Sequence, residues 1–182
     1  ASYGKDLEGF GKKPWFRKGR ENNKWAGRAG CTLSHKTVMD LAIEKRWQTI
    51  LIFEDDFEPK IKNPEIWSQL ETVLFESNTE WLVCYLGFTT PCGPVKKVNN
   101  INKHYSLNKL RGAKTTHAYL IKQPMITWLA RSLPSEENIW EWCSKYRVID
   151  RWYSRNLSLK KVVRCVSPSL FIQQESSSDI AG

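Results

Sequence analysis

The sequence predicts an α/β fold in which a mostly parallel sheet is flanked by helices. Short apolar runs at Thr49–Phe53, Trp81–Leu86 and Thr115–Ile121 are typical of buried strands. Helical patterns lie between these runs, as expected for an α/β chain. With 182 residues the chain can bury a substantial core, so we expect one domain over residues 1–182.

Composition limits the classes of function. Hydrophobic residues make up 41% and charged residues 26% of the chain, as in soluble globular proteins. No apolar run approaches the roughly 18 residues of a membrane helix, and the opening residues carry no apolar signal segment. The five cysteines form no CxxC pair and have no histidine at zinc-ligand spacing, which favours a reducing compartment. We therefore expect a cytoplasmic protein. Its net charge of +9 permits binding of an anion, a nucleic acid or an acidic membrane face at the periphery.

Residues 1–26 are predicted to form a basic loop punctuated by glycines. Trp15, Phe16 and Trp25 lie among its cations, a mixture that could grip phosphates while stacking on a ring; a solvated loop is the alternative. The cations of this opening segment are Lys12, Lys13, Arg17, Lys18, Arg20, Lys24 and Arg28. Because an α/β domain usually opens on a strand, we expect that a first strand and helix are missing from this chain.

A glycine-rich turn is predicted next. Gly27 and Gly30 allow a tight turn that leads into a helix over about Ser34–Lys45. The first turn of such a helix presents free amides beside Thr32, Ser34 and His35, which together form an anion seat. Ser34 is interpreted as a helix cap.

An acidic cluster follows the first predicted strand. Glu54, Asp55 and Asp56 come directly after Phe53, at the end of a strand where ligands bind in open α/β sheets. Adjacent carboxylates repel one another, so a bound cation would explain them, and oxygen ligands suit Mg²⁺ or Mn²⁺. The alternative is a solvated acidic turn.

The remaining segments extend the α/β pattern. Asn63-Pro64-Glu65 begins a second helix, as an N-cap followed by proline at the first helical position. Residues 88–110 are rich in Gly, Pro, Asn and Lys, and we predict an active-site loop there. His117 has apolar neighbours and is predicted to be an interior histidine. Further elements are expected at Pro124–Leu133 (helix), Glu136–Arg155 (helix) and Lys161–Val166 (strand).

The order of these pieces resembles the signature of glycosyltransferase family 25. That signature is a Gly-Cys-x-x-Ser-His turn, a helix, and a strand that ends in Glu-Asp-Asp. In this chain the pieces are Gly30-Cys31, Ser34-His35 and Glu54-Asp55-Asp56. The family includes lipopolysaccharide and lipooligosaccharide galactosyltransferases and the related collagen galactosyltransferases. Later segments are similar to the family in the same order: Trp81–Gly87, Thr116–Ile121, Asp150, Gln174 and Ser178-Asp179-Ile180.

The resemblance implies an A-type, Rossmann-like glycosyltransferase fold, although the family's opening strand is not visible in this chain. It also implies a nucleotide-sugar donor, a divalent metal (Mn²⁺ or Mg²⁺) and an inverting mechanism. By analogy the donor is UDP-galactose and the acceptor is a hydroxyl of a glycan or glycoconjugate. Asp56 is the expected metal ligand, with Glu54 or Asp55 on the metal or the donor ribose. The further donor-binding residues expected are Gly30, Ser34, Ser178 and Asp179.

Inversion requires a base on the face of the sugar opposite the diphosphate. The resemblance makes Asp150 the candidate, and the alternative is a surface carboxylate paired with Arg147 or Arg151. His35 is a second candidate, as a base or as a hydrogen-bond donor to phosphate; its alternative role is a local helix cap.

Two classes of function remain open at this point. The intact acidic cluster favours a metal-dependent transferase that moves a hexose, and the missing opening strand favours a non-catalytic carbohydrate-binding module derived from such an enzyme. Nucleic-acid binding has the charge in its favour but no recognised motif, which argues against it.

Overall fold

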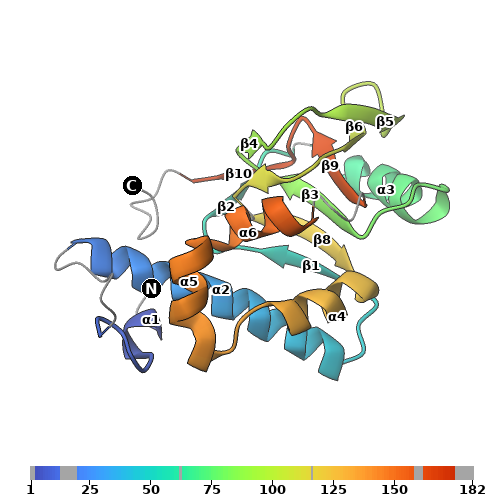
Figure 1. The fold of residues 1–182 in the computed structure, drawn as a ribbon. Coiled ribbons are helices and arrows are strands. Elements are labelled where there is room, and N and C mark those ends of the chain that lie inside the picture. Colours follow the sequence, from blue (N-terminus) through green and yellow to red (C-terminus); the bar gives the residue numbers. More distant parts are fainter. Residues whose placement is uncertain (1–2, 13–19, 62, 116, 158–161, 175–182) are drawn as a thin grey trace. The chain divides into compact units, whose positions relative to one another are not determined.

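The computed structural model describes residues 3–12, 20–61, 63–115, 117–157 and 162–174. Figure 1 draws their helices and strands as a ribbon. These residues fall into two compact units. The first unit comprises the residues up to Trp47 together with Ile126–Trp152, and the second comprises Gln48–Met125 and Tyr153–Gln174.

The first unit is helical. Its main element is α2, which runs without interruption from Arg20 to Glu44. The other elements with residues in this unit are α1 (Tyr3–Asp6), α4 (Gln123–Ser132), η2 (Glu136–Asn138), α5 (Ile139–Tyr146) and α6 (Ile149–Asn156). Among these, α4 begins and α6 ends in the second unit.

The length of α2 corrects two predictions. Residues 1–26 are not a loop throughout, and Gly27 and Gly30 form no turn, because both glycines lie buried inside α2. Buried apolar residues already recur at helical spacing at Ala26, Ala29 and Leu33. Close packing also explains a glycine in α1, since a Cβ on Gly4 would lie 1.9 Å from the carbonyl oxygen of Ala26.

The helix predicted over Glu136–Arg155 is divided in three. The break lies at Arg147, whose φ of 70° ends α5 before α6 begins. In α5, Trp140 donates a hydrogen bond to the carbonyl oxygen of Glu8 at 2.8 Å and packs against Phe10. This contact joins the N-terminal segment to α5 within the first unit.

The second unit is built on a six-stranded sheet with the order β1-β8-β3-β9-β6-β5. Its strands are β1 (Thr49–Phe53), β3 (Val83–Gly87), β5 (Lys96–Asn100), β6 (Ser106–Lys109), β8 (Ala118–Lys122) and β9 (Val163–Ser167). Two small sheets pair β2 (Phe57–Pro59) with β10 (Phe171–Gln173), and β4 (Thr90–Pro91) with β7 (Ala113–Lys114).

The α/β class is confirmed, but the prediction of a mostly parallel sheet is wrong. Among the described strands only β3 and β9 pair in parallel, and the other four neighbouring pairs are antiparallel. Two of these pairs involve β8, which enters between β1 and β3 in the opposite direction, and the other two involve β6, which runs opposite to β9 and β5. Strands β1, β3 and β9 therefore still point the same way, and their carboxyl ends share one edge of the sheet.

The first predicted strand is confirmed over Thr49–Phe53, but it is not buried on both faces. In the described part of the chain β1 pairs only with β8, so it forms one edge of the sheet. Ile50 and Ile52 are buried, whereas Leu51 is 42% and Phe53 37% exposed. The uninterrupted apolar run in the sequence therefore forms an edge strand that is buried on one face only.

Helical segments cover both faces of the sheet within this unit. On one face lie α3 (Glu65–Glu71) and the π-helical turn η1 (Thr72–Glu76), whose Leu70 and Leu74 belong to the same core cluster as Cys84. On the other face Tyr153, from the end of α6, contacts Tyr119. The helix α3 begins at Glu65, one residue after the predicted first position Pro64, and the Glu65 amide donates a hydrogen bond of 3.0 Å to the Asn63 side chain.

Residues 88–110 are not simply a loop. They contain β4 and a hairpin, β5–β6, that extends the sheet at the edge opposite β1. Clear alternation is missing in β5, where four of the five residues are exposed, and this explains why the segment resembles a loop in sequence. Its predicted role at an active site stays a prediction.

Candidate functional site

The acidic cluster lies at the shared carboxyl edge of the sheet, as predicted. Glu54, Asp55 and Asp56 directly follow β1, which ends at the same edge as β3 and β9. The backbone of the cluster is held at both ends: the Glu54 amide donates to the carbonyl of His117 at 2.9 Å, and the Asp56 carbonyl accepts from the Gln174 amide at 2.8 Å. The acids therefore sit on a turn whose path is fixed by two neighbouring segments.

Asp56 has a divided environment. Its Oδ2 accepts a hydrogen bond from the Gln173 side-chain amide at 2.5 Å. Its Oδ1 is buried and has no hydrogen-bond partner in the described part of the chain. A buried carboxylate oxygen without a partner is costly, so a ligand for it is expected. Oxygen donors of this kind fit Mg²⁺ or Mn²⁺, the metals that the sequence indicates.

Aromatic side chains pack next to the turn that carries Glu54, Asp55 and Asp56. Phe53 stacks on Phe57 with ring centroids 4.3 Å apart, and its ring lies 4.9 Å from that of Phe171. Phe171 is in β10, two residues before Gln173, so the strand that packs under the acids also carries the amide that holds Asp56. The packing and the hydrogen bond act together to orient this carboxylate.

His117 is the buried support behind Glu54. It is fully buried, and its Nδ1 lies 3.1 Å from the Thr115 hydroxyl while Nε2 lies 3.4 Å from the Phe171 carbonyl oxygen. The prediction of an interior histidine with its hydrogen bonds satisfied is confirmed. Its ring connects the start of β8 with β10, the same strand that holds Asp56.

Three tyrosines pack together on the face of the sheet opposite α3. The hydroxyls of Tyr119 and Tyr153 are 3.3 Å apart, and the Tyr85 ring lies 6.0 Å from that of Tyr119. Burial raises the pKa of Tyr119 well above its usual value, and the neighbouring Tyr153, Tyr85 and Glu54 raise it further. Tyr119 is therefore neutral, and the Glu54 charge acts on this face as well.

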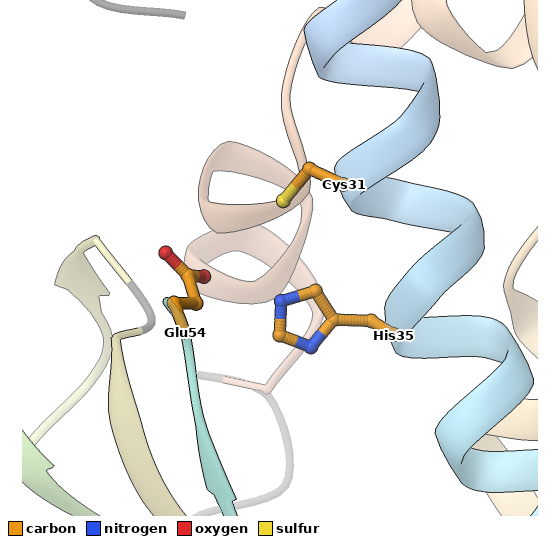
Figure 2. Close-up of side chains that lie close together, drawn as sticks. All are labelled: Cys31, His35 and Glu54. Carbon is orange, nitrogen blue, oxygen red and sulfur yellow. The ribbon is translucent and has the colours of Figure 1, made fainter. Parts of the chain in front are cut away.

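The candidate residues of α2 do not have the predicted setting. Cys31 and His35 project from one side of α2, one turn apart (Figure 2). Because α2 begins at Arg20, neither Ser34 nor His35 caps it, and no anion seat forms at the first turn of a helix here. Ser34 is exposed, whereas Gly30 and His35 are buried. Glu54, which Figure 2 also labels, belongs to the second unit.

Asp150 lies in the first turn of α6, in the first unit. Its Oδ1 accepts a hydrogen bond from the Arg151 amide at 2.6 Å, so the carboxylate is oriented by the start of its own helix. The other two predicted donor contacts, Ser178 and Asp179, lie outside the described residues.

One supporting residue, Gln173, is not predicted from the sequence. The resemblance points to its neighbour Gln174, whose backbone amide contacts the turn, whereas the side-chain amide that holds Asp56 belongs to Gln173. Alternation along the strand was the available signal, because Gln173 has the same parity as the buried Phe171. The contact of His117 with Phe171 had no such signal, since 54 residues separate the two.

A comparison with models of protein families matches most of this chain. The model of glycosyltransferase family 25 (LPS biosynthesis protein) matches residues 12–135, which is more than half of the chain. No curated protein matches the sequence. Among the described helices, none combines the length and apolarity that a membrane span requires.

Proposed function

Because the chain belongs to glycosyltransferase family 25 and is thus a glycosyltransferase, we propose that it transfers a hexose from a nucleotide-sugar donor to a glycan acceptor in lipopolysaccharide biosynthesis. The observation that carries this proposal is the oriented Asp56 carboxylate at the shared carboxyl edge of three strands, whose Oδ1 has no hydrogen-bond partner among the described residues. Family membership also favours the enzyme over the carbohydrate-binding module that the sequence left open.

We propose that Asp56 holds a Mn²⁺ or Mg²⁺ ion, with Glu54 or Asp55 on the metal or on the donor ribose. Such an ion, when bound, neutralises the negative charge that develops on the leaving diphosphate. The Gln173 amide keeps Asp56 Oδ2 occupied and so directs Oδ1 toward a ligand. Gly30, Ser34, Ser178 and Asp179 remain proposed contacts of the donor, and UDP-galactose remains the donor that the resemblance implies.

The proposed reaction inverts the anomeric carbon. The acceptor oxygen bonds to that carbon as its bond to the diphosphate breaks, and the bonding electron pair leaves with the nucleoside diphosphate. Asp150 takes the proton of the acceptor hydroxyl as the base. His35 is the second candidate for this role.

Binding of UDP tests the metal site. We expect calorimetric titration to show tight UDP binding only with Mn²⁺ present, and the Asp56→Ala variant to lose at least about tenfold in metal-dependent affinity, because a direct ligand is removed. Glu58→Ala, which removes an exposed carboxylate from the following strand, is the matched control and should bind like the wild type. Unchanged binding by Asp56→Ala would refute this metal site. Turnover with UDP-galactose against UDP-glucose then tests the donor.

A further inference from the structure

A long internal stretch of the chain has only one sign of charge. Residues 81–135 contain no Asp or Glu and eight Lys or Arg. Six of these cations lie on or just after the β5–β6 hairpin, and all six are exposed: Lys96, Lys97, Lys103, Lys109, Arg111 and Lys114. In the part of the chain that the structure describes, none of the six forms an ion pair with a carboxylate. Among the described residues, this surface is therefore a group of exposed cations without carboxylate partners within ion-pair distance.

Strand register concentrates part of this charge. Lys96 in β5 lies opposite Lys109 in β6, and Lys109 lies opposite Arg164 in β9, so three cations form a row across neighbouring strands. Like charges placed directly opposite each other destabilise a sheet. Burial lowers the pKa of Arg164, whereas the charge of Glu80 opposes that shift. An external anion would relieve the repulsion between the exposed pair Lys96 and Lys109.

The same hairpin exposes aliphatic side chains. Val95 and Val98, which flank Lys96 and Lys97, are each 41% exposed. Strand β5 is the edge of the sheet opposite β1, with β6 as its partner (Figure 1). Aliphatic groups beside lysines suit a lipid headgroup region, where the valines enter the apolar boundary and the ammonium groups meet phosphates.

Nucleic acid is a poorer fit to this surface. Proteins that bind single strands combine cations with exposed aromatic rings on which bases stack. The hairpin, residues 95–109, has one aromatic residue of the Phe, Tyr and Trp type, Tyr105, and it is half-buried. The exposed apolar side chains here are aliphatic instead.

From these observations we propose that the β5–β6 hairpin docks the protein on a membrane surface rich in anionic phospholipid. Lys96, Lys97 and Lys109 supply the charge, and Val95 with Val98 supplies the apolar contact. The site lies at the sheet edge opposite the strand that carries the acidic cluster, and it does not depend on the transferase activity proposed above.

Vesicle sedimentation tests the proposal. The wild type should bind vesicles of phosphatidylcholine with about one third phosphatidylglycerol, fail to bind pure phosphatidylcholine, and be released by salt. The variant K96Q/K97Q/K109Q should bind the anionic vesicles about a hundredfold more weakly, at roughly fivefold per charge. The matched control K5Q/K45Q/K60Q removes three exposed cations elsewhere and should bind nearly as the wild type does. Metal-dependent UDP binding should be the same in both variants.

Several outcomes would overturn the proposal. The proposal is wrong if K96Q/K97Q/K109Q binds anionic vesicles as tightly as the wild type does. It is also wrong if K5Q/K45Q/K60Q weakens vesicle binding equally, because only net charge would then matter. If K96Q/K97Q/K109Q loses binding of an oligonucleotide but still binds vesicles as the wild type does, the surface binds nucleic acid instead. Edge lysines also hinder strand pairing between chains. If K96Q/K97Q/K109Q self-associates, the variant V95N/V98N serves as a second test, because it keeps every charge. Weaker vesicle binding by V95N/V98N supports the proposal, and unchanged binding contradicts it.

Discussion

Two aspartates of this protein have environments that suit different tasks. One oxygen of the Asp56 carboxylate accepts a hydrogen bond from the Gln173 amide. The other oxygen is buried and has no partner among the described residues, which suits the proposed metal ligand. The Asp150 carboxylate is oriented by the Arg151 amide in the first turn of a helix. At the scale of single residues, these hydrogen bonds distinguish the proposed metal ligand from the proposed base.

The variant Asp150→Asn tests the base. Asparagine keeps the shape of the side chain and an oxygen for the Arg151 amide, but it cannot take a proton. We expect kcat to fall by about 10²–10⁴-fold, with UDP affinity unchanged. Steady-state turnover and a UDP titration measure the two quantities. Asp40→Asn, at an exposed ion pair with Lys36, is the control. Near-normal turnover in Asp150→Asn would exclude this residue and leave His35 as the candidate.

At the scale of elements, the end of β3 depends on a glycine. A Cβ on Gly87 would lie 2.4 Å from Nε2 of His117 and 2.9 Å from Cβ of Phe171. The His117 ring cannot easily move, because its two nitrogens face the Thr115 hydroxyl and the Phe171 carbonyl oxygen. Gly87 therefore lets β3, β8 and β10 meet behind the acidic turn.

We expect Gly87→Ala to lower the free energy of unfolding by about 1–3 kcal/mol, through overpacking. Urea denaturation measures this loss. Gly30→Ala is the matched control, because the added Cβ would lie 3.7 Å from its nearest neighbour, the Gly4 nitrogen, which is an ordinary contact. In a helix this change should gain up to about 1 kcal/mol. A Gly87→Ala variant as stable as the wild type would contradict the close packing.

At the scale of the whole molecule, the reactivity of buried thiols can show whether either unit opens. Burial raises the pKa of Cys143, in the first unit, and of Cys165, in the second, to about 12 in each case. Burial also raises the pKa of Cys84, with the nearby Cys165 adding to the shift. Cys31 and Cys92 are only half-buried. The reactive thiolate should therefore be confined to these two residues near neutral pH.

Thiol labelling at pH about 8 should thus modify Cys31 and Cys92 quickly in the native protein and all five cysteines in denaturant, since a pKa near 12 leaves only about one thiolate in 10⁴. Mass spectrometry of the labelled peptides identifies the sites. The double variant C31S/C92S should be nearly inert until it unfolds. Rapid native labelling of Cys143 would show that the first unit opens readily, and the same result at Cys84 or Cys165 would show it for the second unit.

Local pattern was sufficient for several elements. The run Thr49–Phe53 forms a strand with the predicted bounds, and α3 begins within the predicted Asn-Pro-Glu segment. The acidic cluster follows its strand at the shared carboxyl edge, and the family match over residues 12–135 confirms the resemblance that the Gly-Cys-x-x-Ser-His and Glu-Asp-Asp pieces indicated. These features depend on side-chain periodicity and on neighbours a few residues apart.

Contacts between distant residues decided the rest. Two glycines that resemble a turn lie inside α2, where buried residues continue the helical spacing back to Ala26. Strands β8 and β6 run opposite to their neighbours, which makes the sheet mixed, although no local pattern encodes strand direction. Gln173 holds Asp56 across 117 residues of chain. Periodicity in a sequence reports which face of an element is apolar, but the partner that covers this face is chosen by the packing of the folded chain.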